Sequence, residues 1–293
     1  MPELPEVAAL ASYLERTLSG LTADALELGS FAVLKTADPP HTELPGRSLA
    51  RVGRYGKFIS LDFSTAGAGP YFLLFHLAKA GWVRDVESPS SAPLKPGGYT
   101  VARIRLHGPD GPRALDLTEA GTRRSVALYI VRNPADVPAV AALGPDPLEP
   151  AFTPEVFAGI LGGQSGRIKG VLRSQGLIAG IGNAYSDEIL HAARLSPFAP
   201  SSRLDPEAVA VLYAALRQVL REAVAEREGH PARELKDAKR TSMRVHGRTG
   251  LPCPVCGELI REVSYADTSL QYCPHCQTGG KILADRRTSR FLK

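Results

Sequence analysis

The sequence predicts an α+β protein: an N-terminal β-sandwich with flanking helices, a proline-rich linker, a helical domain and a small cysteine-bearing segment. Short apolar or alternating runs, separated by Gly, Pro and Asp clusters, occupy about residues 21–131 and are typical of strands. Five prolines lie between Pro134 and Pro150, and helical periodicity follows to about residue 228. We therefore expect four segments: 1–133, 134–150, 151–238 and 239–293.

The chain begins MPELPEVAAL, which places Pro2 and Glu3 just ahead of a predicted helix over about residues 5–18. Apolar residues recur there at three- and four-residue steps: Leu4, Val7, Leu10, Leu14 and Leu18. Removal of Met1 would leave Pro2 with a free secondary amine, which can attack a carbon and form a covalent intermediate. The carboxylate of Glu3 can move protons. The alternative is an ordinary proline after the initiator, without function.

Composition and charge favour a globular protein with a phosphate-rich partner. Hydrophobic residues make up 44% of the chain and charged residues 22%, as in globular domains. The net charge is +5, yet residues 239–293 alone carry ten Lys or Arg and four Asp or Glu. Such a segment fits a nucleic acid partner or is a solvated basic tail. No apolar run could span a membrane, and acidic Glu3 and Glu6 do not suit a signal peptide, so we expect a cytoplasmic protein.

The four cysteines of the chain predict a metal site. They occur as two CxxC pairs, Cys253-x2-Cys256 and Cys273-x2-Cys276, with sixteen residues between the pairs. Two such pairs at this distance are a strong zinc signal, because each turn presents two thiolates to one ion. Four protein ligands leave no position for a reactive water, so the zinc ion of this ribbon is expected to be structural and not catalytic.

Two helical features are predicted in the third segment. In LDPEAVAVLYAALRQVLREAVAER, Asp205 is the expected N-cap and Pro206 the first helical residue. Upstream, GRIKGVLRSQGLIAGIGNAYSDEIL has the pattern of a helix, two turns and a helix, with Asn183 as the expected cap. A glycine-rich turn before a helix can hold a phosphate with backbone N–H groups, and Lys169 and Asn183 could add contacts. The alternative is a plain helical hairpin whose glycines only permit the turn.

Several motifs follow one another along the chain: MPELPEV, GRYGKF around Lys57, IKGVLRSQGLIAGIGNAYSDEIL, VHGRTGLPCPVCG and YCPHCQ. From Met1 to about Gln277 the sequence resembles the formamidopyrimidine-DNA glycosylase / endonuclease VIII family of base-excision repair enzymes. Each motif alone is weak, and their order makes the resemblance specific. It implies a bifunctional DNA glycosylase and AP lyase that acts on damaged double-stranded DNA as a monomer with one structural zinc ion.

The resemblance also implies roles for individual residues. Pro2 would attack C1′ of the damaged nucleotide, and Glu3 would be the general acid and base. Lys57 would contact a DNA phosphate near the lesion, the alternative being a surface lysine in a turn. Asn183, with Lys169 nearby, would bind backbone phosphate. The zinc ribbon would place a hairpin in the minor groove.

The sequence departs from the family pattern at residues that fill the gap left by the flipped base and at one residue that binds phosphate. The pattern HLGMSG reads HLAKAGW here, with Lys79 in place of Met. The Arg-Arg-Phe-Gly loop reads TRRSV, so Arg123 or Arg124 could fill the gap, but Ser125 replaces Phe. In ADTSLQYC, Thr268 stands where the family has a phosphate-binding Arg.

The length of the loop after Asp237 indicates which class of lesion the protein acts on. Seven residues separate Asp237 from Val245, where members that act on 8-oxoguanine carry a longer loop. We therefore expect an endonuclease VIII-like range of oxidised pyrimidines, abasic sites or a bulkier adduct. The tail TGGKILADRRTSRFLK is expected to touch DNA or to be a disordered end.

Two other function classes stay open on the sequence. A DNA lesion or structure sensor without chemistry would explain the zinc ribbon, the basic C-terminus and the helical hairpin, but not Pro2 and Glu3 together with Lys57. An RNA- or ribosome-associated zinc-ribbon protein would bind RNA as well as DNA.

Overall fold

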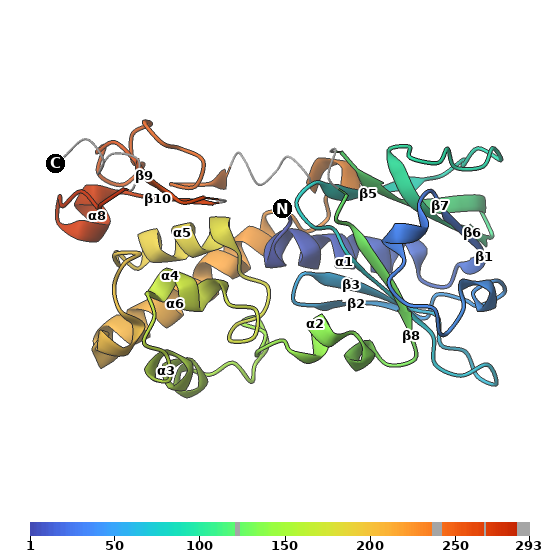
Figure 1. Ribbon diagram of the computed structural model, residues 1–293, viewed down its shortest axis with the longest axis horizontal. Coiled ribbons are helices and arrows are strands. Elements are labelled where there is room, and N and C mark those ends of the chain that lie inside the picture. The colour runs from blue at the N-terminus through green and yellow to red at the C-terminus, as the bar shows by residue number, and fades with distance from the viewer. Residues whose placement is uncertain (121–123, 236–241, 267, 286–293) are drawn as a thin grey trace. The chain divides into compact units, whose positions relative to one another are not determined.

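The computed structural model describes residues 1–120, 124–235, 242–266 and 268–285. The chain divides into two compact units, and the first is discontinuous in sequence. The first unit is Met1–Ala142 with Arg227–Lys236, and the second is Leu143–Glu226 with Asp237–Lys293. Figure 1 labels most of their helices and strands.

The first unit contains helix α1 (Leu4–Leu18) and two antiparallel four-stranded sheets, which confirms the predicted β-rich N-terminal part. One sheet has the order β1-β6-β7-β5 and the other β2-β3-β4-β8. The strands are β1 (Thr22–Leu28), β2 (Arg51–Tyr55), β3 (Phe58–Asp62), β4 (Phe72–His76), β5 (Gly81–Val86), β6 (Thr100–Gly108), β7 (Gly111–Glu119) and β8 (Ala127–Val131). Its short helices include η1 (Phe31–Val33), η2 (His41–Glu43), η3 (Pro134–Asp136) and α2 (Pro138–Ala141).

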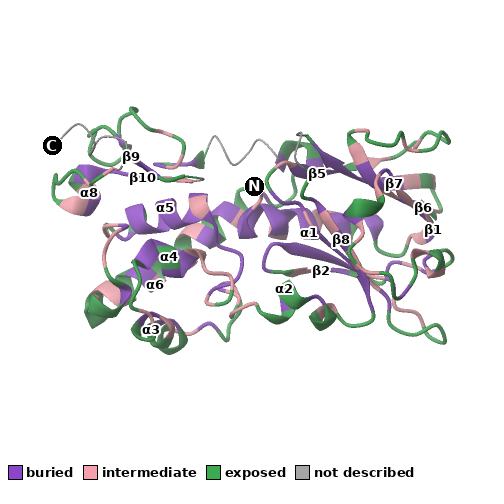
Figure 2. Ribbon diagram, viewed as in Figure 1, coloured by how far each residue is buried: buried purple, intermediate pink, exposed green. Residues whose placement is uncertain are grey.

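One apolar core joins α1 with both sheets. The leucines at positions 10, 14 and 18 of α1 are fully buried in it, as their helical spacing predicts. Strands β3 and β4 are rich in aromatic and branched residues and are buried along most of their length. Figure 2 shows most of α1 in purple, the colour of buried residues.

Residues 227–235 return to the first unit and complete its core. Ala232 and Leu235 are buried in the same cluster as α1 and the sheets. The indole N–H of Trp82 in β5 donates to the carbonyl of Ala232 at 2.8 Å. A buried indole N–H requires such an acceptor, so this segment supplies a hydrogen bond that the contiguous N-terminal residues leave open.

The second unit is helical and ends in a β-hairpin with a short helix. Its elements are α3 (Pro154–Gly162), α4 (Ile168–Arg173), α5 (Asn183–Ala192), η4 (Ser201–Arg203), α6 (Pro206–Ala225), β9 (Arg261–Ser264), β10 (Ser269–Tyr272) and α8 (Pro274–Thr278). The carboxylate of Asp205 accepts from the N–H of Ala208 at 2.8 Å, and Pro206 begins α6, as predicted. Within the described part of the chain, no helix is both long and apolar enough to cross a membrane.

Candidate active site and zinc centre

Pro2 and Glu3 stand immediately before α1, and Glu3 is its N-cap residue. Only 3% of Glu3 is exposed. Its backbone N–H donates to the carboxylate of Glu6 at 2.9 Å, the contact of a capping box. The guanidinium of Arg227 lies 3.4 Å from the other oxygen of Glu6, and both side chains are almost fully buried. The start of the chain is therefore fixed by a buried ion pair.

Lys57 lies in the two-residue turn between β2 and β3, where Tyr55 pairs with Phe58. The preceding Gly56 has a φ of 54°, a left-handed conformation that favours glycine. Lys57 is only 8% exposed, unlike an ordinary lysine at a turn surface. Burial and the charge of Lys57 lower the pKa of His76 from 6.5 to about 4. The ammonium of Lys57 is therefore close enough to the imidazole of His76 to disfavour its protonation.

Of the three residues expected to fill the gap of a flipped base, Lys79 and Arg124 lie among the described residues of the first unit. Lys79 is an exposed residue in the turn that follows β4. Arg124 donates to the carbonyls of Gly97 and Gly98. Arg123 lies outside the described residues, so only the other two expected residues can be placed.

Ser125 is held by a carboxylate that the sequence did not single out. Its backbone N–H donates to Glu119 at 2.6 Å, and its hydroxyl donates to the same oxygen at 3.2 Å. Glu119 is 4% exposed. The end of this loop is therefore fastened by polar contacts rather than presenting an aromatic wedge.

The turn before α5 is built around glycine and glutamine. Gly180 has a φ of 88°, so a side chain there would strain the backbone. Gln175 accepts from the N–H of Gly180 at 3.0 Å and donates to the carbonyl of Ile181 at 2.7 Å. The expected cap at Asn183 is wrong by one residue: Gly182 is the N-cap and Asn183 the first helical residue. Gly182 has the extended backbone of an N-cap residue, with φ −127° and ψ −153°. The side-chain amide of Asn183 donates to the carbonyl of Ser269 in β10, at 2.7 Å.

Lys169 in α4 is 5% exposed, and its ammonium binds three oxygens at the start of α5. The shortest contact is 2.6 Å to the carboxylate of Asp187, followed by Ser186 at 2.8 Å and the carbonyl of Asn183 at 3.0 Å. An ammonium has three N–H groups, which these acceptors can satisfy. The structure therefore brings the two predicted phosphate ligands together, with Lys169 holding the turn of helix that carries Asn183.

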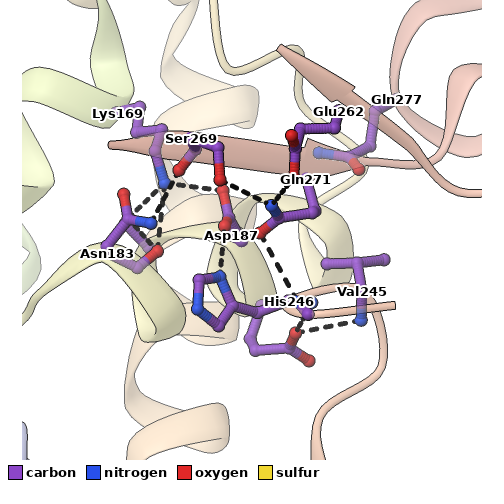
Figure 3. A network of polar contacts seen from close by, with 12 residues as sticks. Lys169, Asn183, Asp187, Val245, His246, Glu262, Ser269, Gln271 and Gln277 are labelled. Atoms are coloured by element: carbon purple, nitrogen blue, oxygen red, sulfur yellow. Dashed lines mark hydrogen bonds and ion pairs between the residues drawn. The ribbon is translucent and has the colours of Figure 1, made fainter. Parts of the chain in front are cut away.

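Two consecutive carboxylates of α5 fix the segment before the first CxxC pair (Figure 3). The second oxygen of Asp187 lies 2.8 Å from Nδ1 of His246. Glu188 accepts the backbone N–H groups of Arg244, Val245 and His246 at 2.8 to 3.0 Å. Burial raises the pKa of Glu188. Sequence reasoning missed both acids, although adjacent carboxylates in a largely buried helix were a signal.

The four cysteines come together at one point. Their sulfur atoms all lie within 4.8 Å of one another. Cys253 and Cys276 are 3.9 Å apart, and Cys256 and Cys273 are 3.4 Å apart. A zinc–sulfur bond of about 2.3 Å in a tetrahedron requires sulfurs roughly 3.8 Å apart, so the donor set fits one zinc ion. No position remains for substrate, which confines the metal to holding the ribbon together.

Comparison with family models covers most of the chain. The N-terminal domain of formamidopyrimidine-DNA glycosylase matches residues 1–125, and its H2TH domain matches residues 143–233. A zinc finger found in FPG and IleRS matches residues 250–279. The chain belongs to the formamidopyrimidine-DNA glycosylase family. It is thus an Fpg-type DNA glycosylase of DNA repair, with a zinc-finger site in its C-terminal segment.

Individual relatives agree with this assignment. Formamidopyrimidine-DNA glycosylase of Moorella thermoacetica is 36% identical over 274 residues, covering 90% of this chain and 94% of that protein. An uncharacterized formamidopyrimidine-DNA glycosylase-like protein of Mycobacterium tuberculosis is 56% identical over 159 residues, covering 54% of this chain and 99% of that protein. The crystal structure of MutM (Fpg) from Thermus thermophilus has a TM-score of 0.78 at 32% identity, covering 96% of this chain and 100% of that one.

Proposed function

We propose that this glycosylase is bifunctional: the amine of Pro2 displaces a damaged base and the enzyme then cleaves the strand as an AP lyase. The placement of Pro2 and buried Glu3 at the start of α1, fixed through Glu6 and Arg227, supports this. A secondary amine can form the covalent intermediate, and Glu3 is the neighbouring group that can move protons. The protein would act as a monomer in the cytoplasm.

The chemistry requires that Met1 be removed. The Pro2 nitrogen then bonds to C1′ and loses its proton, while the base leaves with the glycosidic electron pair and takes up a proton. The C1′–O4′ bond opens next, with Glu3 as the group that passes a proton to O4′, and the Pro2 nitrogen and C1′ form an iminium. This electron sink acidifies the C2′ proton, so the 3′ phosphate is eliminated, and the 5′ phosphate can follow. The pKa of an α-amino group is about 8, so an appreciable fraction of this amine is neutral at physiological pH.

Phosphate contacts would supply the energy of flipping the nucleotide out of the duplex, which costs a few kcal/mol. We assign these contacts to Lys57 in the first unit and to Asn183 in the second, with Lys169 fixing the start of α5. A complex of Lactococcus lactis Fpg, which matches at 22% identity and a TM-score of 0.79, contains DNA with an abasic site. Damaged double-stranded DNA is the corresponding partner proposed here.

We favour oxidised pyrimidines and abasic sites over 8-oxoguanine. The short loop after Asp237 and the polar fastening of Ser125 by Glu119 support an endonuclease VIII-like range. Release of thymine glycol and of 8-oxoguanine from matched duplexes tests this preference. Efficient excision of 8-oxoguanine would contradict it and leave the lyase proposal intact.

Borohydride trapping on duplex DNA with an abasic site tests the covalent step. The wild type should give a protein–DNA band, and Pro2→Gly should give a much weaker one. A form with one extra residue ahead of Pro2 should give none, because its proline nitrogen is a tertiary amide. Pro5→Ala, inside α1, is the matched control and should trap normally.

The opposite outcome would favour a different function. A wild type that binds abasic DNA tightly, has lost Met1 by mass spectrometry and still gives no band would be a lesion sensor without chemistry. Equal affinity for RNA would instead favour an RNA-associated protein.

A further inference from the structure

Helix α5 places a histidine against the zinc site. His191, in the last turn of α5, is 3% exposed, and its Nε2 lies 3.3 Å from Sγ of Cys253. His191 is not part of the group of four sulfurs that lie within 4.8 Å of one another. The imidazole therefore stands beside one ligand of the tetrahedron rather than serving as a further ligand.

The hydrogen bond between these two residues has a defined direction when zinc is bound. A zinc-bound cysteine is a thiolate, which accepts but cannot donate. Nε2 must then carry the proton. The other ring nitrogen, Nδ1, is buried and has no hydrogen-bond partner in the described part of the chain. The thiolate is thus the polar contact that fixes the tautomer and the ring orientation.

A zinc ion bound by four thiolates is stabilised by hydrogen-bond donors to its sulfur atoms. Four thiolates and one Zn²⁺ carry a formal charge of about −2, and N–H donors to sulfur spread that charge. The backbone N–H of Cys276 lies 3.5 Å from the sulfur of Cys273. His191 gives the buried Cys253 a donor from a different element.

A second contact ties the residues after α5 to another ligand. The amide of Gln277 donates to the carbonyl of Leu195 at 2.9 Å, and its oxygen accepts from the N–H of Cys273 at 2.9 Å. The end of α5 is therefore linked to both CxxC pairs, through His191 and through Gln277.

We propose that His191 is a positioning residue of the zinc site, donating its Nε2–H to the Cys253 thiolate and joining helix α5 to the metal. Removal of such a partner typically costs 10–100-fold in metal affinity. Zinc occupancy would in turn support the helix whose first residue is Asn183.

The test measures zinc release to a chromogenic chelator from the full-length protein. His191→Phe should lower zinc affinity about 10-fold or more, and His191→Gln, which keeps an N–H donor, should recover part of the loss. His275→Phe is the matched control, because His275 lies between two ligands in sequence but is exposed, and it should release zinc like the wild type. Equal zinc affinity in His191→Phe and wild type would overturn the proposal.

Cobalt substitution separates the hydrogen bond from a purely structural role. Loss of a donor to sulfur raises the energy of its lone pair, so the thiolate-to-cobalt charge-transfer band of His191→Phe should lie at longer wavelength than that of the wild type or of His191→Gln. If His191→Phe does not fold, His191→Ala takes its place: a band shifted to longer wavelength supports the bond, and an unshifted band overturns it. A wild-type protein that purifies without zinc would overturn it as well.

Discussion

The buried ion pair behind the N-terminus predicts a large effect of a distant substitution. Arg227→Met removes the guanidinium that lies 3.4 Å from Glu6, while Glu6 keeps its bond to the N–H of Glu3. Both partners are at most 2% exposed, so a charge is left buried. Removing one partner of a buried pair costs about 3–5 kcal/mol.

Differential scanning calorimetry would measure that cost. For a unit of this size, each kcal/mol lowers Tm by about 2–4 °C, so we expect a decrease of about 10 °C. Borohydride trapping should fall too, because Glu6 fixes the backbone of Glu3. Arg221→Met, on the exposed surface of α6, is the control and should change stability by less than about 0.5 kcal/mol. A Tm for Arg227→Met within about 2 °C of the wild type, with normal trapping, would refute this account, since such a shift corresponds to less than about 1 kcal/mol.

Three further outcomes are expected. Trp82→Phe removes the donor to the carbonyl of Ala232 and should cost about 1–3 kcal/mol in chemical denaturation; an unchanged midpoint would mean that water replaces the indole. Burial and Lys57 lower the pKa of His76 to about 4. As the pH falls, His76 therefore binds a proton in the unfolded chain at a higher pH than in the folded protein. Stability should therefore fall by about 2 kcal/mol from about pH 8 to about pH 5, and His76→Gln should flatten this fall; an equal slope in both proteins would contradict it. Deletion of residues 286–293, which carry four Lys or Arg and no acid, should weaken DNA binding and its salt dependence; identical salt slopes would argue against contact with DNA.

The sequence predicted those features that depend on residues close to one another along the chain. The cap at Asp205 and the proline after it follow from neighbouring residues alone. The two CxxC pairs predicted the cysteine cluster, because each pair has ligand spacing on its own. The contact of Asn183 with Ser269 could not be predicted in this way, because Ser269 lies 86 positions further along the chain.

In the candidate active site, too, the sequence indicated the residue types but not the contacts between residues far apart in the chain. The sequence singled out Pro2, Glu3 and Lys57 by residue type and by family resemblance, and their roles stay predictions. It did not indicate that Glu6 faces Arg227, a pairing that depends on the chain returning to the first unit after α6. Long-range ion pairs leave no periodicity or spacing for a sequence reading to detect.

The discontinuous first unit has a consequence for synthesis on the ribosome. Arg227 follows Ala142 by 85 residues, so at about 5–20 residues per second it is made roughly 4–17 s later. During that interval the emerging chain lacks both the cation that faces Glu6 and the acceptor for Trp82. The N-terminus of the enzyme is thus completed only after the helical domain has been translated, and a prematurely terminated polypeptide would carry Pro2 without the framework that aligns it.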